Sequence, residues 1–92
     1  MNVREQFGAN VRRARKRSGL SQEALAVRAS IHRTEVGLLE RGERLARIDT
    51  ALKLAGALGV GIDDLLAGMA WTPGETLPGQ FVPPAELPCD DA

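Results

Sequence analysis

Apolar side chains recur at helical spacing from the start of the chain. We expect a first helix over residues 3–17, whose apolar stripe consists of Val3, Phe7, Val11 and Ala14. Asn2 can cap its first turn, with Glu5 three residues later reaching back to the cap. Gly19 can end this helix, because glycine accepts the left-handed backbone conformation.

Four shorter helices are expected over residues 22–29, 33–41, 48–58 and 62–67. Ser21 can cap the first of them, while Gly42 and Gly59 can end the second and third. The side chains expected to face inward are Leu25, Ala26 and Ala29, then Val36 and Leu39, then Ile48, Leu52, Ala55 and Leu58. The last helix offers Leu65 and Leu66. The pattern predicts an all-α fold, a compact five-helix bundle, without alternating strand patterns before residue 70.

The last twenty residues differ in composition from the rest of the chain, because they contain all five prolines. Proline removes a backbone donor and clashes with the preceding helical turn, so no long helix is expected there. We therefore divide the chain into a helical domain, residues 1–68, and a tail, residues 69–92. The tail is either disordered and acidic, or it uses Trp71, Phe81 and Val82 to pack back or to form a strand at a subunit contact.

The net charge of zero hides a gradient along the chain. Residues 1–48 contain 11 basic and 5 acidic side chains, whereas residues 69–92 contain four acids and no base. A zero net charge argues against a nucleic-acid partner, but the basic first half is compatible with one.

Several other classes of protein are not expected. The chain has no apolar run of about 18 residues and no signal peptide, and its one cysteine, Cys89, excludes an internal disulfide framework. These features favour the cytoplasm. A single histidine, His32, has no nucleophile near it in sequence, and there is no glycine-rich phosphate loop. We expect no enzymatic activity, no metal site, no cofactor and no evident small-molecule effector.

The connection between the second and third helices is very short, consisting of Ser30, Ile31 and His32. A turn this tight forces two short helices to cross steeply, as in helix-turn-helix units. The small Ala26 suits such a close crossing, and Ile31 can fill the gap between the helices. On spacing alone, an ordinary α-hairpin in a small bundle is an equally good interpretation.

The stretch from Val11 to Leu66 resembles the helix-turn-helix domain of phage repressor and Cro proteins, the lambda repressor-like or XRE-type regulators. The matching text is VRRAR, GLSQEALAVRAS, TEVGLLERGER, IDTALKLAGALGV and DDLL. The resemblance implies a five-helix bundle whose second and third helices read DNA. The sequence departs from the family pattern at Ser30, usually glycine, and at three positions next to the third and fourth helices: His32, Ala46 and Arg47.

Double-stranded DNA is the partner that the resemblance implies, with the third helix in the major groove. The expected base contacts are His32, Arg33, Thr34, Gly37 and Leu38. The expected phosphate contacts are Gln22, Arg41, Arg44 and Arg47. Arg15 and Glu40 are expected to form a structural pair between the first and third helices.

The family commonly binds palindromic sites as a dimer, so we expect a homodimer. The side chains expected at the dimer contact are Leu65, Leu66, Met69, Trp71 and Phe81, although the two leucines could instead complete the monomer core. The sequence thus predicts a sequence-specific DNA-binding transcriptional regulator. The alternative is a protein-interaction module with the same fold that does not bind DNA, which Glu35 in the third helix and the zero net charge favour.

Overall fold

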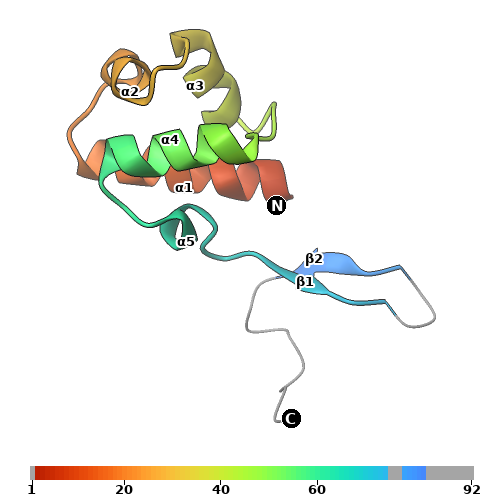
Figure 1. The fold of residues 1–92 in the computed structure, drawn as a ribbon. Coiled ribbons are helices and arrows are strands. Elements are labelled where there is room, and N and C mark those ends of the chain that lie inside the picture. The colour runs from red at the N-terminus through yellow and green to blue at the C-terminus, as the bar shows by residue number, and fades with distance from the viewer. Residues whose placement is uncertain (1, 75–77, 83–92) are drawn as a thin grey trace.

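The computed structural model describes residues 2–74 and 78–82. Its elements in chain order are α1 (Val3–Arg17), α2 (Gln22–Ala29), α3 (Arg33–Glu40), α4 (Ile48–Leu58), α5 (Ile62–Leu65), β1 (Ala70–Thr72) and β2 (Gln80–Val82). Figure 1 shows α2 and α3 at one end of the helical bundle, α1 and α4 across its middle, and the two strands beyond α5 at the opposite end. The expected all-α bundle is confirmed, with a small two-stranded sheet added to it.

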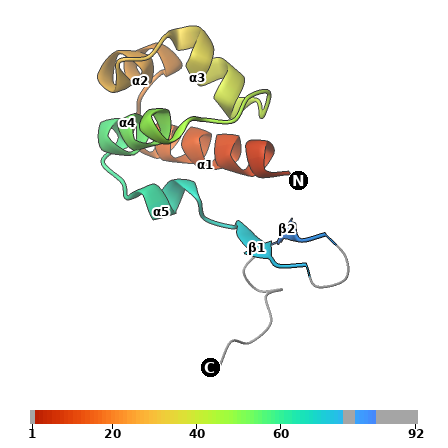
Figure 2. The ribbon, with the colours of Figure 1, turned by 45° about the vertical axis from the view of Figure 1, so that its right-hand side comes forward.

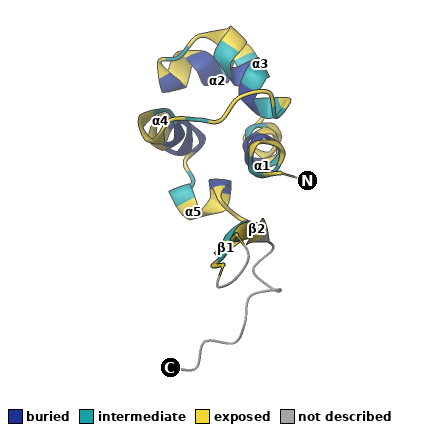
Figure 3. Cartoon of the chain, turned by 90° about the vertical axis from the view of Figure 1, so that its right-hand side faces the viewer, coloured by how far each residue is buried: buried dark blue, intermediate teal, exposed yellow. Residues whose placement is uncertain are grey.

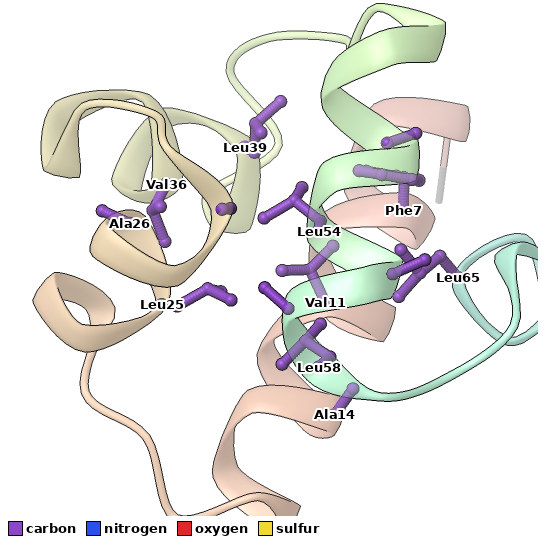
Figure 4. Packing of buried hydrophobic residues seen from close by; sticks show 14 residues of the cluster. Phe7, Val11, Ala14, Leu25, Ala26, Val36, Leu39, Leu54, Leu58 and Leu65 are labelled. Carbon is purple, nitrogen blue, oxygen red and sulfur yellow. The ribbon is translucent and has the colours of Figure 1, made fainter.

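All five helices contribute to one hydrophobic core. Figure 4 shows side chains from α2 and α3 meeting those of α1 and α4, with Leu65 of α5 close to Phe7 and Val11. The largest fully buried side chains are Leu25, Leu39, Leu54, Leu65, Val11 and Val36. The stripes expected for α2 and α3 are therefore confirmed, and that of α1 is confirmed except for the half-buried Val3.

The prediction for α4 was wrong at two of four positions. Ile48 and Leu52 are 81% and 56% exposed, whereas the buried residues are Ala51, Leu54, Ala55, Ala57 and Leu58. The physical reason is that α4 is apolar on two adjacent sides, so periodicity alone does not tell which side faces the core. The core takes the row that begins at Ala51, and the row of Ile48 and Leu52 faces outward.

Two helices end earlier than expected. The structure ends α3 at Glu40, with Arg41 as its C-cap, and ends α5 at Leu65 rather than at residue 67. Both differences lie in the last turn, where helices fray and boundaries shift by one or two residues.

Two residues of α1 that sequence reasoning passed over hold the bundle together. A Cβ placed on Gly8 would lie 2.1 Å from the carbonyl oxygen of Leu39, so only glycine lets α1 approach the end of α3 this closely. The buried amide of Asn10 donates to the carbonyl oxygens of Leu65 at 2.9 Å and Ala67 at 2.8 Å. Asn10 therefore satisfies backbone groups at the end of α5 that the helix leaves unpaired.

The tail forms a short antiparallel hairpin rather than a disordered segment over the residues that the structure describes. Trp71 of β1 faces Phe81 of β2, with ring centroids 5.0 Å apart and an interplanar angle of 73°. Such edge-to-face packing is favourable for aromatic rings. The tail residues Glu75, Glu86, Cys89, Asp90 and Asp91 lie outside the described residues. Within the described part of the chain, no helix has the length and apolar character needed to span a membrane.

Candidate nucleic-acid interface

The turn between α2 and α3 has the geometry of a steep helix crossing. Ser30 lies in the left-handed region, with φ 57° and ψ 42°, where the family that the sequence resembles usually has glycine. The N–H of Ile31 donates to the carbonyl oxygen of Ala26 at 3.0 Å, and the Ile31 side chain packs against the core. Ala26 itself is buried, as its small size allows. Figure 2 shows α2 and α3 joined by this turn at the end of the molecule farthest from the hairpin.

His32 precedes α3 and caps it. Its Nδ1 accepts a hydrogen bond from the backbone N–H of Thr34 at 3.0 Å, which satisfies one of the free donors of the first turn. Histidine thus takes the place of the serine or threonine common at this position. Because Nδ1 is used locally, only the other ring nitrogen of His32 is left to face a ligand.

A buried ion pair fixes α3 to the scaffold. The Nε and Nη2 of Arg15 donate to the two carboxylate oxygens of Glu40 at 2.6 Å and 3.0 Å, and the side chains are only 12% and 3% exposed. The Nε2 of Gln22 also donates to Glu40 at 3.1 Å, and Arg15 donates to the carbonyl oxygen of Leu20 at 2.9 Å. One carboxylate therefore connects α1, the start of α2 and the end of α3.

Four exposed arginines occupy α3 and the segment that follows it. We call them the arginine face: Arg33, Arg41, Arg44 and Arg47. Each one has a carboxylate partner, and the four partners are Glu23, Glu43, Glu35 and Asp49 respectively. Sequence reasoning identified the arginines but not their partners, although the acids lie within ten residues of them in the sequence. The arginine face is therefore nearly neutral in the free protein.

The pair of Arg44 and Glu35 is the most constrained of the four. Nη1 of Arg44 donates to both oxygens of the Glu35 carboxylate, at 2.6 Å and 3.3 Å, and the Glu35 side chain is partly buried. This contact holds the segment after α3 against the first turn of that helix. Glu35 therefore orients Arg44. The remaining nitrogens of the guanidinium can still donate to an anion.

The other predicted base contacts occupy different environments. Thr34 is exposed and Leu38 is half-buried, so both reach the surface of α3. Gly37, in contrast, is buried, and the guanidinium of Arg41 lies next to its Cα. At the start of α2, Ser21 caps the helix by accepting from the N–H of Ala24 at 3.0 Å, beside the half-buried Gln22.

A second surface lies on α4, α5 and the hairpin, and it is apolar. We call it the α4–α5 face, and its exposed large side chains are Leu45, Ile48, Leu52, Leu66, Trp71 and Phe81. Figure 3 shows the exposed outer side of α4 and the buried side that faces α1. Beneath these side chains is a groove of about 470 Å³, with Val3, Leu66 and Met69 in its wall. The same three residues line a smaller hollow with Trp71 and Phe81, so the groove continues onto the hairpin.

The structure divides the predicted dimer residues into two groups. Leu65 is fully buried in the monomer core, so for this residue the expected role at a subunit contact is wrong and the core alternative holds. Leu66, Trp71 and Phe81 are exposed, and Met69 is half-buried in the groove wall. Burial of Leu65 follows from the packing of α5 against α1, which the sequence does not specify.

A family model for helix-turn-helix proteins matches residues 11–65. Control protein C.BamHI of Bacillus amyloliquefaciens is 44% identical over 66 residues, which cover 71% of this chain and 82% of the relative. Control protein C.SmaI of Serratia marcescens is 41% identical over 66 residues, covering 72% and 79%. The crystal structure of the restriction-modification controller protein C.AhdI from Aeromonas hydrophila superposes with a TM-score of 0.66 at 40% identity, covering 67% of this chain and 94% of that one.

The match to the family model covers more than half of the chain and includes the whole of α2, its turn and α3. The geometry agrees with the match, because a capped α2, a left-handed turn residue and an α3 with one exposed face form a helix-turn-helix unit. The chain belongs to the helix-turn-helix family of repressor-like regulators and is a non-enzymatic, DNA-binding transcriptional regulator.

Proposed function

We propose that this regulator inserts α3 into the major groove of double-stranded DNA and reads a specific sequence there. The arginine face carries this proposal. Arg33 and Arg41 lie at the two ends of α3, a helix of 8 residues that spans about 12 Å, comparable to the width of the major groove. Arg44 and Arg47 follow in the adjoining segment, where phosphates flank the groove. Their carboxylate partners are exposed or partly exposed and can be exchanged for DNA.

Direct readout is assigned to the start of α3. Arg33 is exposed and presents a fork of donors that suits the O6 and N7 acceptors of guanine. Thr34 can hydrogen-bond a base or place its methyl group against that of thymine, and Leu38 can meet thymine methyl groups. His32 can contribute through the ring nitrogen that its capping bond leaves free.

Phosphate binding is assigned to Arg44, Arg47 and the start of α2. The free N–H groups and the positive end of the helix dipole make the first turn of α2 a suitable anion site. Gln22 uses one N–H to reach Glu40 and has a second N–H for a phosphate oxygen. These contacts would set affinity and orientation rather than sequence preference.

We further propose that the regulator acts as a homodimer through the α4–α5 face. Six large apolar side chains on one connected surface are more than a small monomer usually leaves in water. The partner we assign to this face is a second copy of the chain, because two copies related by a two-fold axis would read the two halves of a palindromic site. Leu66, Met69, Trp71 and Phe81 would contribute, together with Ile48 and Leu52, which the sequence had placed in the core.

Among regulator classes, we propose a controller of a restriction–modification system. Two relatives above 40% identity are named control proteins, and a structure at 40% identity is titled a restriction-modification controller. The DNA partner would also place the protein in the cytoplasm.

Selection of fragmented genomic DNA by the full-length protein tests this function. The bound fragments would be sequenced after titration at several salt concentrations. We expect one enriched, two-fold symmetric sequence, located beside restriction and modification genes, and binding that weakens steeply with salt. The absence of both an enriched sequence and a salt dependence would favour the alternative, a protein-interaction module. An enriched sequence located elsewhere would retain the DNA-reading role and reject only the controller class.

A further inference from the structure

Position 37 of α3 has no side chain, and the guanidinium of Arg41 fills the space where one would begin. A Cβ placed on Gly37 would lie 2.9 Å from Nη1 of Arg41, 3.7 Å from Cζ and 3.8 Å from Nη2. Gly37 is buried, although its position on α3 faces the same way as residues expected to meet DNA. The charged end of the Arg41 side chain therefore covers Gly37.

Helix geometry explains this arrangement. Arg41 is the C-cap of α3 and keeps α-helical backbone angles, φ −84° and ψ −2°. Side chains four residues apart lie on one face of a helix, and they lean toward its N-terminus. The Arg41 side chain thus runs back along α3 over Gly37. Thr34, three residues before Gly37, lies on the same face of α3. Thr34 and the guanidinium of Arg41 therefore lie one after the other on this face.

Glu43 holds the guanidinium from one side. Nε of Arg41 donates to the Glu43 carboxylate, while Nη1 and Nη2 are the atoms that lie over Gly37. The side chains of Arg41 and Glu43 are both more than half exposed, so this ion pair lies at the surface of the protein. A guanidinium held at Nε keeps its two terminal nitrogens available as a pair of parallel donors.

From this geometry we infer that Arg41 is a second base-reading residue, which recognises the O6 and N7 edge of a guanine in place of a side chain at Gly37, with Glu43 as its positioning residue. The inference rests on the proposed placement of α3 in the major groove. It departs from the role expected from the sequence, in which Arg41 neutralises a phosphate. A phosphate requires only positive charge near the backbone, whereas a guanine requires the planar fork in a fixed position.

The test is selection from random double-stranded DNA by the full-length protein and its variants, followed by sequencing. Arg41→Lys keeps the charge and removes the fork, and we expect it to reduce the preference for guanine at one position of each half-site about tenfold. Gly37→Ala keeps Arg41 but displaces its guanidinium, so we expect the same position to relax. Glu43→Gln should relax it less. Arg12→Lys, the same change at an exposed position of α1 outside the arginine face, is the matched control and should leave the selected sequence unchanged.

The outcomes separate this inference from the proposed function. If the unmodified protein selects no sequence, the proposed function fails. If it selects a sequence that Arg41→Lys and Gly37→Ala also select with unchanged preference at every position, Arg41 is a phosphate contact and the inference is overturned. Melting curves of both variants would accompany the selection. Because Arg41 is exposed, Arg41→Lys should melt like the unmodified protein and remain interpretable even if Gly37→Ala unfolds.

Discussion

Two surfaces of the molecule expose very different side chains to water. On the arginine face, all four cations have carboxylate partners within the same chain. On the α4–α5 face, six large apolar side chains are exposed: four of them line a groove, and the other two form the aromatic pair of the hairpin. Exposed ion pairs contribute little to stability and can exchange one anion for another. Exposed apolar side chains gain free energy only by burial. The comparison assigns DNA recognition to the first surface and self-association to the second.

Two ion pairs near the end of α3 should differ most in their contribution to stability: the buried pair Arg15–Glu40 and the exposed pair Arg41–Glu43. Glu40→Ala leaves Arg15 and Gln22 without their shared partner, and we expect it to lower the free energy of unfolding by about 3–5 kcal/mol. Glu43→Ala removes a surface partner of Arg41 and should change stability by less than about 1 kcal/mol. Thermal or urea unfolding of both variants would measure the difference in their free energies of unfolding. Equal melting temperatures would show that the Arg15–Glu40 pair has no structural role.

The role of the α4–α5 face can be tested by adding a charge to it. Leu52→Glu should leave the fold intact, because Leu52 is exposed, but weaken self-association by about one to two orders of magnitude, the cost of withdrawing one apolar side chain. Val27→Glu is the matched control, since Val27 is 75% exposed on α2, outside this face. Sedimentation velocity across a concentration series would measure the dimer. Unchanged association of the Leu52 variant would rule out this face as the dimer contact.

Base reading and phosphate binding on the arginine face should respond differently to mutation. Arg33→Ala should cost about 1–3 kcal/mol on the preferred sequence and relax one base position. Arg44→Ala should weaken all sequences to a similar extent, because a phosphate carries no sequence information. Competition binding with single-base variants of the selected site would separate the two effects. If both variants relax the same position, or neither does, the division between α3 and the following segment is wrong.

The smallest expected effect concerns the tail acids. Replacing Glu75, Glu86, Asp90 and Asp91 with their amides removes four negative charges, which we expect to compete weakly with DNA for the arginines. We expect DNA affinity to rise by less than about threefold at low salt and to be unchanged near 0.15 M salt, where exposed charges are screened beyond about 8 Å. Titrations at both salt concentrations would show it. A loss of affinity would mean that these side chains support binding.

The sequence predicts the parts of the fold that depend on local patterns. The helices, the glycines at their ends and the pair of Arg15 and Glu40 follow from periodicity, capping chemistry and the family resemblance. Features that depend on tertiary packing were not predictable. Periodicity does not distinguish the two apolar sides of α4, so Ile48 and Leu52 were placed in the core. A polar residue within an apolar stripe is the signal by which Asn10 could have been found.

The candidate site shows the same division. The arginines were identified because their spacing and the helix-turn-helix pattern are local, but their carboxylate partners depend on side-chain geometry. The cap formed by His32 and the position of Arg41 over Gly37 also require coordinates. The hairpin was not predicted: the expected alternatives for the tail were disorder, packing of its aromatic side chains on the domain, or a strand at a subunit contact. The hairpin forms where Trp71 of β1 packs against Phe81 of β2.

The salt dependence of binding to the selected sequence tests the central claim most directly. For the unmodified protein, log K should fall linearly with log salt, with a slope of about −0.9 for each phosphate neutralised. Arg44→Ala and Arg47→Ala should each reduce the magnitude of this slope by about 0.9, while Lys53→Ala, at an exposed position of α4, should leave it unchanged. Slopes that are zero, or that are equal for all four proteins, would contradict the assignment of DNA binding to the arginine face.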